Sequence, residues 1–320
     1  MTTEKDPAMP RRTKWAVSVD KLKVCLTQPQ ETFDYIRDHT SYAAIDGMRV
    51  LDEDGYKLVV VEGDETAMTV ALDVMDAGGE FLRLGIFQLN GAGSKYQGRA
   101  FFCFENSALY DVFGVTADRK KANWVDMLLP IAEDMGMAFN NVTEVEVALD
   151  TETNIIYRLR KLIKDVENYD MYLNGRKVEE GTLLCNYGEY YERSREKLSR
   201  CPTLYFKQSK DTDMALKVYD KAKELEERSP GKASRYHNWI GWSDTNRIYR
   251  AEVTMHNTNV REFCERQGRW LAEQGEHGNI LGLLGMGGFR MAMFEYAADR
   301  MVYFRDRTSG ERVSITDLLG

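Results

Sequence analysis

Short runs of apolar residues, several of them alternating with polar ones, mark much of this chain as β-strand. Alternation places every second side chain on the same face of a strand, so one face can cover a core. The predicted strands are residues 15–26, 56–62, 81–88, 98–105, 141–150, 203–206, 216–221 and 248–253. In addition, Asn174-Gly175 predicts a tight hairpin within residues 169–185.

Helical spacing marks a second set of segments. Apolar residues recur three or four positions apart, the spacing of an amphipathic helix, in residues 31–39, 123–136, 153–168, 261–273 and 289–304. We therefore predict an α+β fold, with a mostly antiparallel central sheet flanked by helices. In this prediction residues 1–14 are a disordered leader, residues 15–258 one domain, and residues 259–320 a small helical C-terminal tail.

Composition argues against a membrane protein and favours the cytoplasm. The 320 residues contain no apolar run long enough for a transmembrane helix, and the polar N-terminus lacks the apolar core of a signal peptide. The five cysteines are scattered, which favours reduced thiols. The net charge of −8 is unusual for a DNA-binding protein. Between residues 190 and 250, however, basic residues outnumber acidic ones by about five, which is compatible with a basic DNA-binding face.

Residues 216–221 carry the first candidate chemistry. Leu216 and Val218 occupy one face of this predicted strand. The other face carries Lys217, Tyr219 and Lys221. A phenol between two ammonium groups can attack a phosphodiester, because the cations hold the phosphate and stabilise the charge of the transition state. The two lysines are also expected to favour the phenolate form of the tyrosine.

Carboxylates on two other predicted strands indicate a cation site. Glu144, Glu146 and Asp150 share one strand face, where they would repel one another without solvent or a cation. Glu252 shares the face of a further strand with Arg250. Mg²⁺ and Mn²⁺ prefer oxygen ligands, so these carboxylates predict a divalent metal beside the tyrosine. A solvated acidic strand face explains the first three carboxylates equally well.

Other residues compete for these roles. The chain has 17 tyrosines, so a tyrosine among lysines at a sheet edge is expected by chance. A second cluster, formed by Tyr187, Tyr190 and Tyr191, could supply a nucleophile or stack on bases. The four histidines include no His-x-His pair, and only His256 falls on the strand face of Glu252.

The order of these motifs resembles the Rep_trans family, the replication initiators of rolling-circle plasmids together with related relaxases of mobile elements. The matching segments are Thr-Leu-Tyr-Phe at 203–206, Ser-Lys at 209–210, Leu-Lys-Val-Tyr-Asp-Lys-Ala-Lys-Glu at 216–224, and Arg-Ala-Glu at 250–252. Residues 142–150 look like a variant of the family's upstream acidic strand. The order and rough spacing agree from about residue 15 to 260.

The resemblance implies a fold like that of the HUH endonucleases, with carboxylates in place of the histidine pair. It also implies a metal-dependent DNA nickase and strand transferase that acts through a 5′-phosphotyrosine. By position it assigns the nucleophile to Tyr219, a contact to the scissile phosphate to Lys221, and the ligands of Mg²⁺ or Mn²⁺ to Glu146, Asp150 and Glu252. The sequence departs from the family at Glu144, where arginine is usual, at Glu146, where aspartate is usual, and at Lys207-Gln208, where glycine is usual.

The implied partner is plasmid origin DNA, as a hairpin or a single strand at the nick, together with a host helicase and polymerase. Assembly of the chain into a homodimer is compatible with the resemblance. The residues expected to contact the DNA backbone are Lys207, Lys210, Lys217, Lys223 and Arg250. One alternative is a relaxase with the same chemistry at a transfer origin. Another is a non-catalytic DNA-binding protein of the same fold, and a third is an unrelated cytoplasmic α+β protein with chance motif matches.

Overall fold

The computed structural model describes most of the chain from residue 14 onward. The described residues are 14–42, 49–76, 78–113, 124–179, 183–186, 189–192, 203–207, 214–242, 247–268 and 280–319. The expected leader, residues 1–14, lies outside them except for Lys14.

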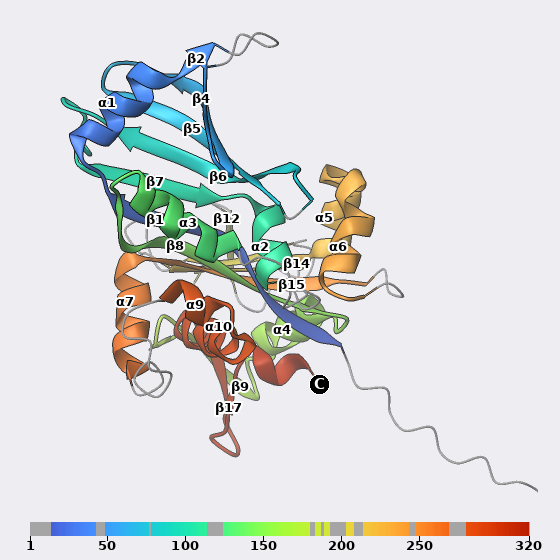
Figure 1. Ribbon diagram of the computed structural model, residues 1–320. Coiled ribbons are helices and arrows are strands. Elements are labelled where there is room, and N and C mark those ends of the chain that lie inside the picture. The colour runs from blue at the N-terminus through green and yellow to red at the C-terminus, as the bar shows by residue number, and fades with distance from the viewer. Residues whose placement is uncertain are drawn as a thin grey trace, which may run out of the picture.

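An antiparallel sheet of eleven strands organises the described residues (Figure 1). From edge to edge its order is β13-β14-β15-β8-β1-β7-β6-β5-β4-β3-β2. The strands are β1 (Trp15–Thr27), β2 (Ser41–Tyr42), β3 (Arg49–Glu53), β4 (Tyr56–Gly63), β5 (Ala67–Met75), β6 (Phe81–Asn90), β7 (Arg99–Phe104), β8 (Ala138–Thr151), β13 (Thr203–Lys207), β14 (Met214–Asp220) and β15 (Tyr249–His256). The first strand of the chain therefore lies beside β8, and β15 separates β8 from β14.

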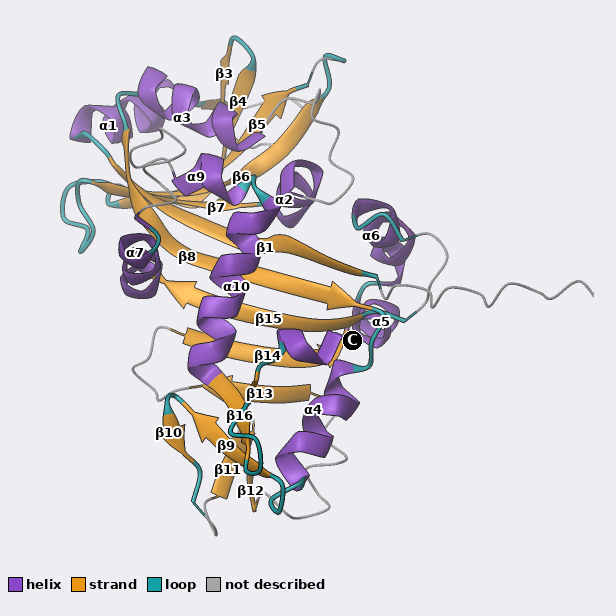
Figure 2. Cartoon of the chain, turned by 90° about the horizontal axis from the view of Figure 1, so that it is seen from below, coloured by secondary structure: helices purple, strands orange, loops and turns teal. Residues whose placement is uncertain are grey.

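Helix α10 (Gly287–Met301) packs on the apolar face of this sheet. On the other face of the sheet, α2 (Asn106–Phe113) and α6 (Ala233–Trp239) make contacts through Tyr110 and Tyr236. Figure 2 shows α10 running across the strands, and α10 contacts β1, β8, β15 and β14. The helices are α1 (Gln30–His39), α2 (Asn106–Phe113), α3 (Trp124–Asp134), α4 (Ile155–Lys164), α5 (Lys221–Arg228), α6 (Ala233–Trp239), α7 (Asn257–Arg266), α9 (Ile280–Leu284) and α10 (Gly287–Met301), with two short 3-10 helices at Pro230–Lys232 and Thr316–Leu319. Strand residues on the covered face, such as Val147, Leu149, Val218 and Val253, are fully buried.

The C-terminal segment differs from the predicted helical tail, because it is part of the main fold. Its buried α10 side chains belong to the same core as the central sheet; they include Phe289, Met293, Phe294, Ala297 and Met301. The segment also supplies two strands to a second sheet, whose order β10-β9-β16-β17 consists of Arg176–Lys177, Tyr169–Leu173, Val302–Asp306 and Arg312–Val313. A two-stranded sheet, β11 (Leu183–Asn186) with β12 (Glu189–Glu192), completes the described elements.

The predicted α+β class is confirmed, as is the mostly antiparallel sheet flanked by helices. The predicted hairpin is also present, since β9 and β10 are joined at Asn174 and Gly175, whose φ angles of 52° and 74° are those of a two-residue turn. Among the described helices, none is long and apolar enough to span a membrane.

Candidate functional site

Polar side chains gather on the face of the central sheet opposite α10. In the strand register Lys217 lies opposite Glu252, and Thr254 lies opposite Glu146. Because residues that face each other in antiparallel strands point to the same side, β14, β15 and β8 present these side chains together. The neighbouring strand β1 adds Asp20, which sits at a register shift between β1 and β8.

Tyr219 lies against a carboxylate. Its hydroxyl donates to Oε2 of Glu252 at 3.1 Å, while Nζ of Lys217 donates to Oε1 of the same carboxylate at 2.8 Å. Burial raises the pKa of Tyr219 far above that of a free phenol. The prediction that Lys217 and Lys221 favour a phenolate is therefore wrong. Lys217 is paired with Glu252, and Nζ of Lys221 lies 2.7 Å from Glu224.

Three carboxylates meet beside this tyrosine. Oxygens of Asp20, Glu146 and Glu252 all lie within 4.8 Å of one another, the only such acidic cluster among the described residues. Burial raises the pKa of Glu146, and the charge of Glu252 raises it further. Burial acts in the same direction on Asp20, but Arg250 and Lys221 outweigh it and lower the pKa of Asp20 to about 2.

Asp150, predicted as a metal ligand, does not join this cluster. Its Oδ1 accepts from Nε of Arg250 at 2.8 Å, and its Oδ2 accepts from Nη2 at 2.9 Å and from the hydroxyl of Tyr236 at 2.6 Å. The residue is fully buried. Both carboxylate oxygens are thus used in a buried ion pair, and Asp20 takes the position that the sequence assigned to Asp150.

Arg250, predicted to contact DNA, is buried as well, with no exposed surface on its side chain. Besides Asp150, it donates from Nη1 to Oδ1 of Asp20 at 2.7 Å and from Nη2 to the hydroxyls of Tyr110 and Tyr236. The guanidinium cannot reach a DNA backbone from this position. It instead holds Asp20 in place, and so positions one member of the carboxylate cluster.

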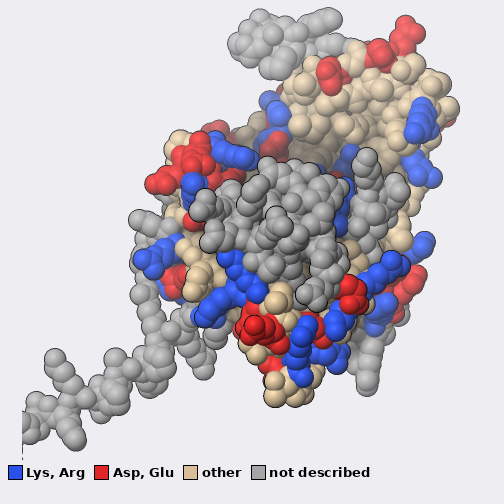
Figure 3. All heavy atoms as spheres, turned by 180° about the vertical axis from the view of Figure 1, so that it is seen from behind, with Lys and Arg blue, Asp and Glu red and all other residues tan. Residues whose placement is uncertain are grey.

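The predicted backbone-contacting lysines differ in their surroundings. Lys207 and Lys223 are exposed, Lys217 is paired with Glu252, and Lys210 lies outside the described residues. Lys221 lines the pocket described below, and its side chain is 12% exposed. On the face shown in Figure 3, Lys and Arg lie interspersed with Asp and Glu instead of forming one large basic patch.

Tyr219 and the carboxylate cluster open into a pocket of about 510 Å³. Its lining includes Asp20, Glu146, Lys217, Tyr219, Lys221 and Glu252. Of the competing tyrosines, Tyr187 and the side chains of Tyr190 and Tyr191 lie outside the described part of the chain. His256 ends β15 opposite Glu144 and is not a member of the cluster.

Asp20 was the functional residue missed in the sequence. The apolar positions of β1 change phase there: Val17 and Val19 are buried, and the next buried residues are Leu22 and Val24. Such a slip indicates a β-bulge, and bulges are used to redirect a side chain. The signal was therefore present in the sequence, but it does not say that the redirected side chain meets Glu146 and Glu252.

Comparisons with known proteins add little to these observations. No family model and no curated protein matches the sequence. Among solved structures, a rolling-circle replication initiator protein from Geobacillus stearothermophilus is similar, with a TM-score of 0.41 and 14% sequence identity over 93% of this chain and 89% of that chain. Because that TM-score is too low to establish a common fold, we infer function from the side chains.

Proposed function

We propose that this chain is a rolling-circle replication initiator that nicks and rejoins origin DNA through Tyr219. The hydrogen bond from Tyr219 to Glu252 carries the proposal, because it joins the nucleophile to a cluster of three carboxylates at a pocket wall. A nucleophile, a proton acceptor and candidate cation ligands thus meet in one place. The motifs that contain Tyr219, Glu146 and Glu252 follow the order seen in the Rep_trans family, whereas Asp20 lies outside them.

In the proposed reaction the phenol oxygen of Tyr219 attacks the scissile phosphorus. The bond from phosphorus to the 3′ oxygen breaks, and the 5′ end of the DNA stays on the tyrosine. Glu252 takes up the phenol proton through the oxygen that lies 3.1 Å from it. A base is needed because the buried phenol has a raised pKa.

The products explain why an initiator would use this chemistry. The departing 3′ oxygen takes a proton from solvent and becomes a 3′-OH that a host polymerase can extend. The phosphotyrosine keeps the energy of the broken phosphodiester, so the reverse attack by a 3′-OH can rejoin the strand. Lys221 lines the pocket and would contact the phosphate in both directions.

The carboxylate cluster fits Mg²⁺ or Mn²⁺. Asp20 and Glu146 would hold the ion, since both offer the oxygen ligands that these cations prefer. Glu252 would join them only through the oxygen that now accepts from Lys217, because its other oxygen accepts from Tyr219. When bound, the ion would polarise a non-bridging phosphate oxygen and offset the charge of the transition state. Among the described residues, the hydrogen bonds to Asp20 fall on its Oδ1.

A relaxase of a mobilisable element would use the same residues at a transfer origin, and the site does not distinguish it from an initiator. A non-catalytic DNA-binding protein of the same fold would need neither the bond between Tyr219 and Glu252 nor three converging carboxylates. The geometry therefore favours an enzyme, with nicking as the activity to test.

The test is a nicking assay on supercoiled plasmid that carries the gene for this chain, with Mg²⁺ or Mn²⁺ present. Tyr219→Phe removes only the attacking oxygen, so this variant should bind DNA but neither nick it nor form a covalent adduct. Tyr205→Phe is the matched control, because Tyr205 lies on the adjacent strand opposite Lys217, and it should nick normally. Covalent attachment of Tyr219→Phe to a 5′ DNA end would refute the assignment and point to another tyrosine, with Tyr187, Tyr190 and Tyr191 the next to substitute.

A further inference from the structure

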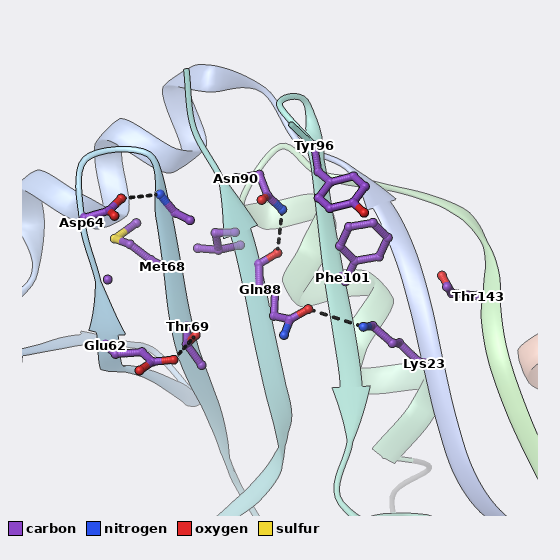
Figure 4. A pocket seen from close by; sticks show the side chains of 13 residues that line it. Lys23, Glu62, Asp64, Met68, Thr69, Gln88, Asn90, Tyr96, Phe101 and Thr143 are labelled. Atoms are coloured by element: carbon purple, nitrogen blue, oxygen red, sulfur yellow. Dashed lines mark hydrogen bonds between the residues drawn. The ribbon is translucent and has the colours of Figure 1, made fainter. Parts of the chain in front are cut away.

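A second pocket, of about 770 Å³, opens on the same face of the central sheet (Figure 4). Its lining includes Lys23, Glu62, Thr69, Gln88, Tyr96 and Phe101. The register connects it to the candidate site, since Lys23 of β1 lies opposite Glu144 of β8, two residues from Glu146. Gln88 lies opposite Phe101 on one side and opposite Thr69 on the other. One continuous sheet face therefore carries both pockets.

Two aromatic rings form part of the pocket wall. The rings of Tyr96 and Phe101 meet edge to face, with centroids 5.5 Å apart and planes at 88°. The side chain of Tyr96 is 47% exposed, so its ring is accessible from solvent. Nζ of Lys23 lies 5.3 Å from the centroid of the Phe101 ring. Figure 4 shows the two rings next to each other, with Lys23 reaching toward Gln88.

Hydrogen-bonding groups surround the rings. The amide of Gln88 is exposed, and its Oε1 accepts from Nζ of Lys23 at 3.4 Å. Thr69 donates to Glu62 at 3.2 Å. Thr143 also lines the pocket, and its hydroxyl oxygen is buried without a hydrogen-bond partner among the described residues. Aromatic faces beside amide and hydroxyl groups are the means by which proteins hold unpaired bases.

We infer that this pocket binds bases of the single strand whose phosphate is attacked at Tyr219. The charge of the lining favours a base over a bare phosphate, because Lys23 is its one cation and Glu62 and Asp64 are both acidic. The inference rests on the proposed function for the identity of the strand. Three strand steps and seven residues along β1 separate the level of Phe101 from that of Glu252. At about 4.8 Å per strand step and about 3.3 Å per residue, the separation across the sheet is about 27 Å, the length of about eight stacked nucleotides.

Fluorescence anisotropy with the full chain tests the inference without knowledge of the origin. The probes are a labelled 20-nucleotide oligo-dT and an abasic strand of the same length, in buffer without divalent metal. Phe101→Leu removes the aromatic face but keeps an apolar side chain, and should weaken oligo-dT binding at least about fivefold while leaving abasic binding unchanged. Tyr96→Ala, in an exposed loop, should weaken it in the same way. The matched control is Tyr157→Leu on α4, a tyrosine that is 59% exposed and outside the pocket.

Each outcome decides the inference. Equal binding of oligo-dT by wild type and by both pocket variants, with unchanged circular dichroism, overturns it, and so does wild-type protein that binds both probes equally. Photo-crosslinks from 5-iodouracil that map to residues 96–101 support it, and crosslinks that map only elsewhere overturn it. These results are independent of nicking. If the pocket variants lose base-dependent binding while Tyr219→Phe still nicks, the pocket stands and the nucleophile assignment falls.

Discussion

Asp150→Asn separates the structural role of Asp150 from the metal role that its place in the sequence suggested. In the fold Asp150 receives three hydrogen bonds, two from Arg250 and one from Tyr236, and it is fully buried. Removing one partner of a buried ion pair typically costs about 3–5 kcal/mol, because the other charge is left without compensation. The introduced Asn still accepts a hydrogen bond and Asp20 still faces Arg250. We therefore expect the free energy of unfolding to fall by the lower limit of this range, about 3 kcal/mol.

The assay is urea denaturation followed by circular dichroism, together with calorimetric titration of Mn²⁺. With a urea m-value of about 3 kcal/mol/M, the loss shifts the midpoint down by about 1 M. Mn²⁺ affinity below the transition should stay within about twofold of wild type, because Asp150 is outside the carboxylate cluster.

Asp170→Asn is the matched control. Asp170 also accepts from two cations, Arg307 at 2.8 Å and Lys177 at 2.9 Å, but it does so at the surface of the second sheet. Surface pairs contribute about 0–1 kcal/mol, so this variant should change the midpoint little. If Asp150→Asn keeps wild-type stability but loses Mn²⁺, the buried network has been misread and Asp150 is a ligand.

Three further outcomes are expected. Glu146→Gln should weaken Mn²⁺ binding at least about tenfold by calorimetry, because Glu146 belongs to the carboxylate cluster. Glu144→Gln should not weaken it, because Glu144 pairs with Lys21 at 2.8 Å; equal losses of affinity in the two variants would show that the cluster is not the metal site. Lys223→Ala should reduce the slope of log affinity against log salt for single-stranded DNA by about 0.7, and an unchanged slope would exclude Lys223 from the backbone contacts. Partial burial raises the pKa of Cys264 to about 11. Its alkylation by iodoacetamide at pH 8 should therefore be about a hundredfold slower than that of a free thiol and should accelerate as the pH rises toward 11, whereas an ordinary rate would show that the pKa is not raised.

The local pattern of the sequence was sufficient for many of the elements and for one face of the site, although it missed β5 and predicted a helix where β16 begins. Alternation on β14 separates Leu216 and Val218 from Lys217 and Tyr219, and the fold keeps that division, with the first two fully buried. The hairpin at Asn174-Gly175 follows from turn chemistry in the same way. These features depend on neighbours within a few residues, which is why a single sequence predicts them.

Which side chains meet across the sheet was decided only by the tertiary structure. Alternation assigns Glu146, Asp150 and Arg250 to the polar face, but it does not give the strand order β14-β15-β8-β1. It also does not say that the bulge in β1 brings Asp20 to Glu146 and Glu252. That order places Arg250 directly opposite Asp150. A guanidinium and a carboxylate buried together must pair, because neither charge can stay unpaired away from water. Asp150 therefore pairs with Arg250 and lies outside the carboxylate cluster. The third carboxylate of the cluster is Asp20, which is distant from Glu146 and Glu252 in the sequence.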